Sequence, residues 1–358
     1  MDGKPKSTSS RIEYVDLLRG LAVFGMFVVH TPVPWMLPAY VDGEYGHVIS
    51  QVSGMVAPVF LFLAGLSAAG IACRAGEVAA PAPFRGRIAR RGLEVLLVGY
   101  GLNLSFLVMG GFAGGLALLL KIDILQCIGA SLALAALLVS PRRIWSWAAL
   151  AAAVVFVLGA QVTWRVPLQD AMPAGIAGYL TYIQGAARFP LFPYAGWVAL
   201  GVFVGPAWWR AARRPEIERR FFVGLLAAGA ICFALGFLTE WAYFHYGLSK
   251  LGTHGGPPPR TTVHHFLFKA GIVFALFALA RIAHRAAKSP PGRALVLFGR
   301  TSLFAYCAHL VVVYHVLGPF LRRSLGPLGH ALGVAALTAI MIAACVAWSR
   351  AREWWRAR

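Results

Sequence analysis

The chain has 358 residues, of which 59% are hydrophobic and only 13% charged, and its mean hydropathy is +0.69. In soluble domains about a quarter of the residues are charged, so this composition argues against one or two soluble domains and favours a chain that crosses a membrane many times. The formal net charge of +20 would suit a nucleic-acid partner, but the distribution of the charges along the chain does not.

Ten apolar stretches have roughly the length of a membrane-spanning helix, which needs about 20 apolar residues. They cover residues 15–36, 53–73, 92–110, 123–140, 144–163, 190–208, 221–243, 263–283, 300–319 and 329–348. We therefore expect an all-α, polytopic transmembrane bundle, with an N-terminal tail at 1–14, the membrane domain at 15–348 and a basic C-terminal tail at 349–358. The region 111–140 has room for a short re-entrant piece before its span, and the polar stretch 166–188 is expected at the interface.

Lysine and arginine alternate between the two sides of the predicted membrane domain. With a cytoplasmic N-terminus, the cytoplasmic loops and tails hold 24 of the 33 Lys and Arg, and the opposite loops hold seven. Cytoplasmic loops of membrane proteins carry such an excess, so we expect both termini in the cytoplasm and a multi-pass protein of the inner (plasma) membrane. Anionic lipid headgroups are the expected partners of the basic residues, and nucleic acid is not. The sequence leaves open whether the chain forms a homo-oligomer.

The first predicted span, LLRGLAVFGMFVVHTP, contains an arginine, Arg19, and a histidine, His30. Ionisable residues inside a membrane span are costly and point to a functional site. At about 100° per residue, their spacing brings His30 back to within about 20° of Arg19 and places it roughly 16 Å further along the helix. One face of this helix thus carries a cation near its cytoplasmic end and an imidazole in its outer half. Asp16, one turn before Arg19, is a candidate structural partner for the arginine.

Other polar candidates lie toward the outer side of the predicted bundle. His47 falls in the first outer loop, and Ser302, Tyr306 and His309 recur at helical spacing on one face of the ninth span. A plain hydrogen-bond network between helices would also place polar groups on such a face. The alternative is that His309 or Tyr306 orients an acyl carbonyl or a catalytic imidazole.

A second group of candidates flanks the outer loop between the seventh and eighth spans. It consists of Glu240, which would orient a histidine or contact an acceptor amine, together with His264 and His265. The prolines at 257–259 would make this loop a stiff lid. The five cysteines have no metal-ligand spacing, so no metal is expected. Asp123 opens the fourth span beside Lys121, and local pairing of these two side chains is the expected role.

These residue types suit acyl transfer from a thioester. The reaction needs a base that deprotonates the acceptor, or a nucleophile that carries the acyl group, and neutral imidazole serves either role. Arginine suits the phosphates of an acyl-CoA donor because its planar guanidinium makes paired contacts. The spacing from Arg19 to His30 is comparable to the reach of an extended pantetheine arm. We expect donor binding by Arg19, Asp16, Tyr306 and Ser302, catalysis by His30, His47 or His309, and acceptor binding by Glu240, His264 and His265.

Several segments carry a family resemblance. YVDLLRGLAVFGMFVVH resembles the first span of integral-membrane acyltransferases, in which an acidic residue precedes Arg-Gly and a histidine follows the arginine. Asp16, Arg19, Gly20 and His30 occupy those places. Further segments resemble the heparan-α-glucosaminide N-acetyltransferase-like branch, namely APVFLFLAGLS at 57–67, DILQCIGASL at 123–132, RFPLFPYAGWVALGVFVG at 188–205 and GRTSLFAYCAHL around 300–310. The segments follow the family order over most of the chain.

The resemblance implies that an acyl group, acetyl in the first place, moves from cytoplasmic acyl-CoA to an acceptor, often a sugar, on the far side of the membrane. In animal members of this branch the catalytic histidine lies in the first outer loop. This chain has a histidine in both places, so the choice between His30 and His47 stays open. We favour His30, because it shares a helix face with Arg19 and would be held more firmly than a loop residue.

Two functions of other classes compete with this interpretation. In a transporter or exporter, Arg19, Glu240 and the histidines would line a proton or substrate pathway. An inverted repeat would favour that function, and the sequence shows no such symmetry. A structural subunit of an envelope-assembly complex is the third hypothesis. The sequence does not identify the acceptor, the length of the acyl group, or whether transfer is direct or through an acylated enzyme.

Overall fold

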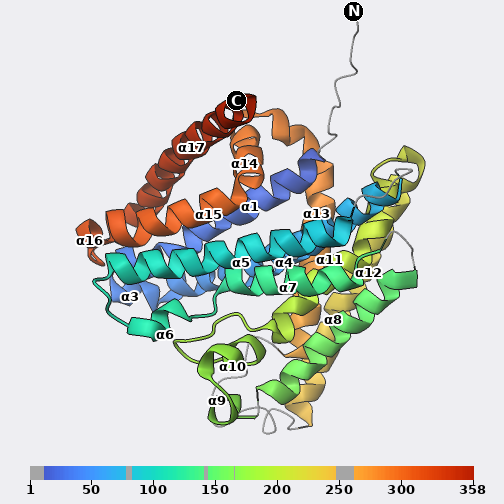
Figure 1. The fold of residues 1–358 in the computed structure, drawn as a ribbon, viewed down its shortest axis with the longest axis horizontal. Helices are drawn as coiled ribbons and strands as arrows, with labels where there is room; N and C mark the ends of the chain where they lie inside the picture. The colour runs from blue at the N-terminus through green and yellow to red at the C-terminus, as the bar shows by residue number, and fades with distance from the viewer. Residues whose placement is uncertain (1–11, 78–82, 141–143, 165, 247–261) are drawn as a thin grey trace, which may run out of the picture.

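A computed structural model of the protein describes residues 12–77, 83–140, 144–164, 166–246 and 262–358. These residues are almost entirely helical and contain no β-sheet (Figure 1). The fold class expected from the sequence, an all-α polytopic bundle, is therefore confirmed. Residues 1–11 of the expected N-terminal tail and the prolines at 257–259 lie outside the described residues.

Nine helical segments of the described chain are long and apolar enough to cross a membrane. Their main helices are α1 (Glu13–His30), α4 (Glu44–Gly76), α5 (Phe84–Met109), α8 (Ile144–Thr163), α11 (Leu191–Ala211), α12 (Pro215–His245), α13 (Val263–Ile282), α15 (Ser302–Val311) and α17 (Pro327–Ala357). The short α2 (Pro32–Trp35) continues the first segment, and α16 (Gly318–Leu321) ends the eighth. Each of the nine segments overlaps a stretch expected from the sequence.

The tenth expected span forms α7 (Ile124–Leu138), which has only 15 residues. At about 1.5 Å per residue it is about 22 Å long, less than the roughly 30 Å thickness of the hydrocarbon core. Asp123 caps its N-terminal end, because the Asp123 Oδ1 accepts the Ile124 N–H at 2.8 Å and the Gln126 side chain accepts the Asp123 N–H at 3.2 Å. A short helix, α6 (Gly115–Leu119), precedes α7, where a re-entrant piece was expected.

The polar stretch between α8 and α11 holds two short helices, α9 (Leu168–Ala171) and α10 (Ala174–Leu180). The segment that follows pairs with the residues in front of α7. The Ile122 N–H donates to the Ala186 carbonyl at 2.8 Å, and the Arg188 N–H donates to the Ile122 carbonyl at 3.0 Å. Irregular backbone needs such internal partners wherever water is scarce. These bonds fix residues 186–188 beside the start of α7.

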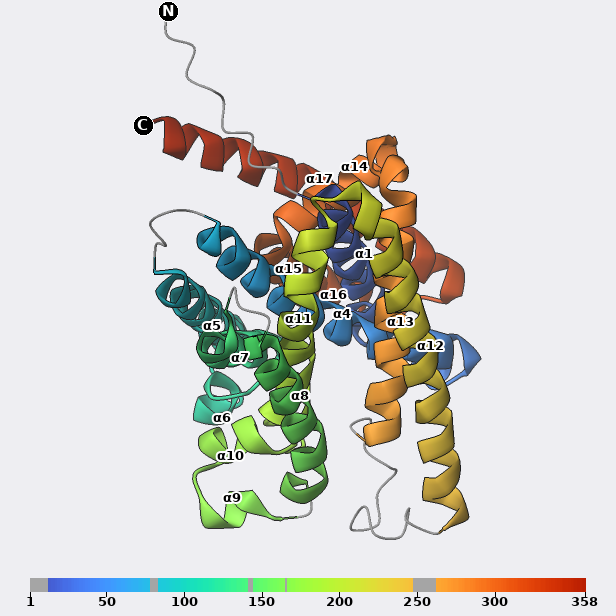
Figure 2. The same ribbon diagram turned by 90° about the vertical axis from the view of Figure 1, so that its right-hand side faces the viewer.

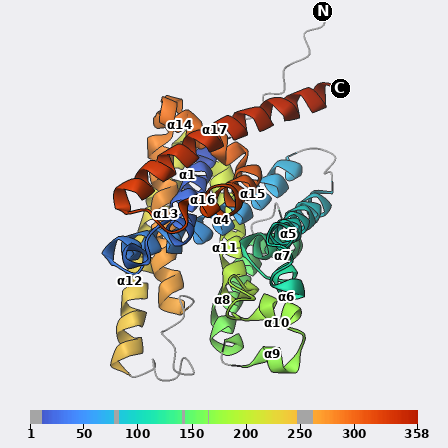
Figure 3. The same ribbon diagram turned by 90° about the vertical axis from the view of Figure 1, so that its left-hand side faces the viewer.

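The helices pack in pairs around α1, α4 and α11. Figures 2 and 3 show α12 and α13 side by side on one flank of the molecule, with α5 and α7 on the other. α11 lies between α4 and α8. Large apolar side chains stay exposed on the outer helices, for example Ile231, Phe237 and Leu238 on α12. An all-round apolar surface of this kind is what lipid contact requires.

Close backbone contact fixes the N-terminal half of α1. The helix α14 (Pro290–Arg300) lies across α1, and two glycines make the approach possible. A Cβ atom on Gly20 would lie 1.7 Å from the Leu295 carbonyl oxygen, and one on Gly299 would lie 1.9 Å from the Asp16 carbonyl oxygen. Both distances are far shorter than any van der Waals contact, so neither position has room for a side chain.

The segment after α15 changes its helical pitch. Residues Val312–Leu317 form a π-helical turn, η3. Such turns interrupt the regular hydrogen-bond ladder and occur frequently at functional sites. Here the Val313 carbonyl accepts a hydrogen bond from the buried indole of Trp35 at 3.1 Å. This bond ties the C-terminal part of the ninth predicted span to the end of α2.

Candidate functional site

Two histidines that are far apart in the sequence meet inside the bundle. His30 ends α1, and His309 lies on α15, where its side chain is fully buried. The His30 Nδ1 lies 2.9 Å from the His309 Nε2, and the two rings are nearly parallel, with centroids 5.2 Å apart. Phe27 packs against the His309 ring at a centroid distance of 5.1 Å. The pair is therefore held by both a hydrogen bond and ring contacts.

The hydrogen bonds of His309 determine which nitrogen of each ring carries a proton. The His309 Nδ1 lies 3.0 Å from the Ala305 carbonyl oxygen, which can only accept, so Nδ1 is the protonated nitrogen. In a neutral ring the His309 Nε2 then accepts, and the His30 Nδ1 must be the donor. This assignment leaves the His30 Nε2 with its lone pair available, which is the form that a base or a nucleophile needs.

Tyr306 completes this cluster from one turn earlier on α15. Its ring lies edge-on to both imidazoles, with centroid distances of 6.4 Å to His30 and 5.5 Å to His309. The side chain is buried, and its hydroxyl has no hydrogen-bond partner among the described residues. A hydroxyl in this state is ready to donate to a ligand. Ser302, at the start of α15, lies about 10 Å from His309 along the helix axis and is outside the cluster.

Arg19 lies in the N-terminal half of the same helix as His30. Its guanidinium donates to the Asp16 carboxylate at 3.0 Å and to the Ser67 hydroxyl on α4 at 2.9 Å. Asp16 also faces Arg300 at 3.6 Å. Because α1 is continuous from Glu13 to His30, Arg19 and His30 are separated by about 16 Å along its axis. The structural pairing with Asp16 is thus present, and the Arg19 side chain remains 21% exposed.

The second catalytic candidate, His47, lies in the first turn of α4 and is exposed. Its side chain has no hydrogen-bond partner among the described residues. Tyr45, two residues earlier, instead contacts a buried histidine that sequence reasoning did not select. The Tyr45 hydroxyl lies 2.9 Å from the His330 Nδ1, and the His330 Nε2 lies 2.7 Å from the Thr31 hydroxyl. His330 thereby holds Thr31, the residue next to His30.

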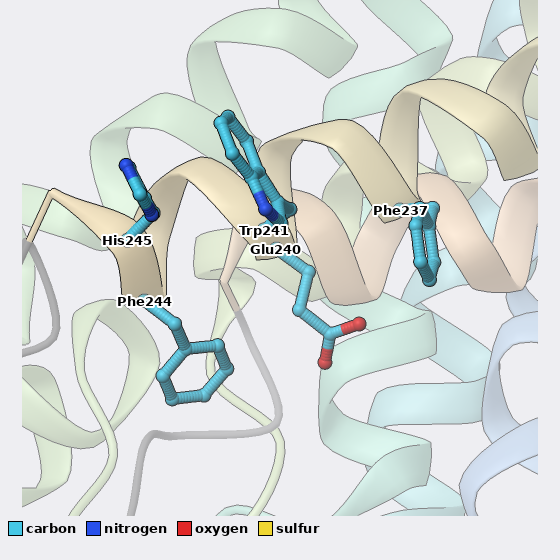
Figure 4. A pocket seen from close by; sticks show the side chains of 5 residues that line it. All are labelled: Phe237, Glu240, Trp241, Phe244 and His245. Carbon is cyan, nitrogen blue, oxygen red and sulfur yellow. The ribbon is translucent and has the colours of Figure 1, made fainter.

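The expected acceptor residues lie on a different pair of helices. Glu240 lies near the C-terminal end of α12, where it lines a shallow hollow with Trp241, His245 and two phenylalanines (Figure 4). His264 begins the neighbouring α13, is buried, and lies 2.9 Å from the Thr262 hydroxyl. The Glu240 carboxylate is near enough to His264 to interact with it electrostatically. His265 contacts the His264 ring edge-on. The cluster of His30, Tyr306 and His309 is formed by α1 and α15 instead.

Two charged residues that the sequence analysis did not assign to the site lie close to that cluster. Asp123 and Arg188 both interact electrostatically with His30 and with Tyr306. Asp123 forms the expected local pair with Lys121, at 3.7 Å. Arg188 is exposed and opens one of the family-like segments, which was the available signal in the sequence. No pattern in the sequence shows that the segments carrying Asp123 and Arg188 pair with each other.

Comparison with known proteins gives one match. The family model described as "Heparan-alpha-glucosaminide N-acetyltransferase, catalytic" matches residues 11–246, about two thirds of the chain. The matched range includes Arg19, His30 and His47, and it ends before α15, which carries His309. A search of curated proteins found no match. Among the described residues, the structure has no group of three or more His, Cys, Asp or Glu side chains placed to hold a metal ion.

Proposed function

Because this chain belongs to the heparan-alpha-glucosaminide N-acetyltransferase catalytic family, we propose that it moves an acyl group, acetyl in the first place, from cytoplasmic acyl-CoA to a sugar at the outer face. The acceptor atom is an amine or hydroxyl of the sugar. Membership of this family identifies the chain as a membrane acyltransferase. The donor, the acceptor and the site residues are our proposals. The observation that supports these proposals is the hydrogen-bonded pair of His30 and His309.

In the proposed reaction, the Arg19 guanidinium receives the phosphates of the donor at the cytoplasmic end of α1. The pantetheine arm then extends along the bundle and brings the thioester to His30, about 16 Å away. Partial exposure of Arg19 leaves its guanidinium accessible beside Asp16 and Ser67. A fixed anchor and a fixed base on one helix hold the reacting groups in a defined geometry, which lowers the entropic cost of the reaction.

The His30 Nε2 carries the chemistry by one of two routes. In direct transfer, it takes a proton from the acceptor as the acceptor attacks the thioester carbonyl, and the proton passes to the departing CoA thiolate. In the covalent route, the same nitrogen attacks the carbonyl and CoA leaves as the thiolate. The acceptor then displaces the imidazole from the acyl group, and the proton that the acceptor loses neutralises the CoA thiolate. On either route His309 accepts the His30 Nδ1–H and keeps the ring oriented. The unpartnered Tyr306 hydroxyl is placed to donate to the oxyanion that forms.

The test is transfer by the purified protein from radiolabelled acetyl-CoA to a panel of amino sugars and glycans. We expect transfer by the wild type, a loss of at least about 100-fold in turnover for His30→Ala, and near-wild-type turnover for His47→Ala. His284→Ala, on the cytoplasmic side, is the matched control. If turnover survives in His30→Ala and disappears in His47→Ala, the catalytic histidine is His47, in the first turn of α4. Absence of transfer to any acceptor would favour a transporter.

Radiolabelled acetyl that remains on the protein distinguishes the covalent route from direct transfer. If the donor is supplied without acceptor, the covalent route retains the acetyl group on wild-type protein and not on His30→Ala. Direct transfer leaves both proteins unlabelled under the same conditions.

A further inference from the structure

A buried carboxylate near the start of α1 lies between two arginines. The Asp16 side chain is only 8% exposed, and its Oδ1 accepts a hydrogen bond from the Arg19 guanidinium at 3.0 Å. The second guanidinium belongs to Arg300, the last residue of α14, whose Nε lies 3.6 Å from the Asp16 Oδ2. A buried carboxylate needs opposite charge beside it. Asp16 therefore brings both arginines to one place.

The crossing of α14 over α1 fixes the position of the second arginine (Figure 1). A Cβ atom on Gly299 would lie 1.9 Å from the Asp16 carbonyl oxygen, so the backbones of the two helices touch at this point. Arg300 is the next residue along α14. Its Cα is therefore held beside Asp16, whatever its side chain contacts.

The two guanidinium groups differ in how firmly they are held. Arg19 makes hydrogen bonds to Asp16 and Ser67 and is 21% exposed. Arg300 is 43% exposed, and its distance of 3.6 Å from the Asp16 Oδ2 is longer than a hydrogen bond. That oxygen has no hydrogen-bond partner among the described residues. Two guanidinium groups around one carboxylate leave an excess of one positive charge, and Arg300 is the group that an incoming anion can reach.

The order of these groups along α1 matches the order of groups in an acyl-CoA. Asp16 precedes Arg19 by three residues, so it lies about 4.5 Å further from His30 along the helix axis, and Arg300 contacts it there. In acyl-CoA the thioester is followed by the pantetheine arm, the diphosphate and then the 3′-phosphate of the ribose. With the thioester at His30 and the diphosphate at Arg19, the 3′-phosphate is the next anionic group of the donor, and it falls on the side of Arg300.

We infer that Arg300 binds the 3′-phosphate of the donor and thereby selects coenzyme A thioesters over donors that lack this phosphate. The inference rests on the proposed function, because it extends the donor site that begins at Arg19. Guanidinium binds phosphate through two parallel hydrogen bonds, which replace the long contact with Asp16. An acyl group carried on phosphopantetheine alone, as on an acyl carrier protein, lacks the group that Arg300 binds. Arg300 is a specificity residue and takes no part in proton transfer.

CoA and dephospho-CoA differ only in the 3′-phosphate, so their binding tests the inference without turnover. Loss of a hydrogen bond to a charged group typically costs about 10-fold or more in affinity. In isothermal titration with the purified full-length protein, we expect the wild type to bind CoA at least about 10-fold more tightly than dephospho-CoA. In Arg300→Gln the Kd for CoA should rise by at least about 10-fold, while the Kd for dephospho-CoA stays unchanged and shows that the site is folded.

The matched control is Arg293→Gln, which removes another exposed arginine from the same helix and should bind both ligands as the wild type does. If Arg300→Gln does not fold because Asp16 has lost a partner, the double variant Asp16→Asn with Arg300→Gln removes both charges. The double variant should also lose the preference for CoA. Equal affinities of the wild type for the two ligands, absence of CoA binding, or equal losses for both ligands in Arg300→Gln would overturn the inference.

Anionic lipid headgroups offer the same phosphate chemistry, so the titrations are made in bilayer discs of phosphatidylcholine with and without phosphatidylglycerol. We expect the preference for CoA, and its loss in Arg300→Gln, in both kinds of disc. If Arg300→Gln keeps the preference, and phosphatidylglycerol raises the melting temperature of the wild type alone, Arg300 holds a lipid headgroup and the inference is wrong. A selective loss of CoA affinity supports the inference even if no acceptor is acetylated, which would defeat the proposed reaction alone.

Discussion

The imidazole rings of His30 and His309 lie at 13° to each other, with the His30 Nδ1 2.9 Å from the His309 Nε2. The Ala305 carbonyl beyond them orients the His309 ring. A backbone oxygen therefore sets the tautomer of one ring, and that ring sets the tautomer of the other. The exposed His47 has no comparable support.

Loss of His309 should lower turnover without weakening donor binding. His309→Ala removes the acceptor of the His30 Nδ1–H, so the His30 ring is free to rotate and to change tautomer. We expect kcat to fall by about 10- to 100-fold, with KM for acetyl-CoA unchanged. This is less than most of the roughly 100- to 10,000-fold that a general acid or base itself contributes, because His309 acts through His30. His309→Gln, whose amide oxygen can accept the same proton, should recover part of the loss. His315→Ala on η3 serves as the control. Wild-type kcat in His309→Ala would show that the pair has only a packing role.

Arg19 should anchor the donor. Arg19→Lys keeps the charge but loses the planar pair of donors that faces Asp16 and Ser67. A hydrogen bond to a charged group is worth about 1.5–3 kcal/mol, so the Kd for CoA in isothermal titration should rise by at least about 10-fold. Ser67→Ala, which leaves the guanidinium in place, should change the Kd much less. An unchanged Kd in Arg19→Lys would leave Arg19 as the structural partner of Asp16.

The contact between α1 and α14 should tolerate no side chain at Gly20. Alanine there places a Cβ 1.7 Å from the Leu295 carbonyl oxygen, and overpacking of this kind costs about 1–3 kcal/mol or more. We expect Gly20→Ala to lower the melting temperature by several degrees or to prevent accumulation of folded protein. Gly101→Ala on α5, where no atom lies within 4 Å of the added Cβ, should be neutral. Equal melting temperatures for the two variants would refute the close approach.

Glu77, just beyond α4, should stabilise the cytoplasmic ends of α4 and α11. Partial burial opposes its ionisation, but hydrogen bonds from Trp209 and Arg213 outweigh this effect and hold the pKa of the Glu77 carboxyl below its ordinary value. A depressed pKa contributes stability above the unfolded-state pKa and loses it as the pH falls. Because the pair is half exposed, Glu77→Gln should lower the melting temperature by only about 2 °C at pH 7. The difference should shrink as the pH falls below the ordinary Glu pKa of about 4.3 and disappear once the pH is below the lowered pKa of Glu77. A difference that persists there would point to packing instead.

The orientation in the membrane is a prediction that labelling can check. With both termini in the cytoplasm, a cysteine in place of the exposed Val48 on α4 should react with an impermeant maleimide added from outside. A cysteine in place of Arg352 should react only after the membrane is opened. Labelling of position 48 from the cytoplasmic side alone would reverse the topology, and with it the assignment of donor and acceptor faces.

The sequence was sufficient to locate the helices because apolar runs of span length are long and continuous. The sequence also predicted that Arg19 and His30 share one face of their helix, because the regular turn of a helix sets the angle between any two of its residues. It predicted that Tyr306 and His309 share a face of their span. It could not show that this face meets His30, because contact between residues 279 positions apart depends on which helices become neighbours.

Arg188 and His330 illustrate a second limit. The segment that carries Arg188 is joined to the start of α7 by two backbone hydrogen bonds between irregular segments, and irregular segments have no periodicity from which pairing can be predicted. His330 begins the last long helix and looks like one more interfacial histidine in the sequence. Its importance becomes visible only when Thr31 and Tyr45 are both found within hydrogen-bond distance of its ring.

The two attachments of α1 have a consequence for the choice of donor. Near its cytoplasmic end the helix is locked to α14 at Gly20, and at its outer end Thr31 is tied to His330. A helix fastened at both ends cannot slide, so in the proposed reaction it keeps a fixed distance between Arg19, which would hold the donor phosphates, and His30, which would receive the thioester. Shortening the pantetheine arm should therefore abolish transfer even when the acyl group is unchanged. Lengthening the acyl group beyond the thioester leaves the measured length intact.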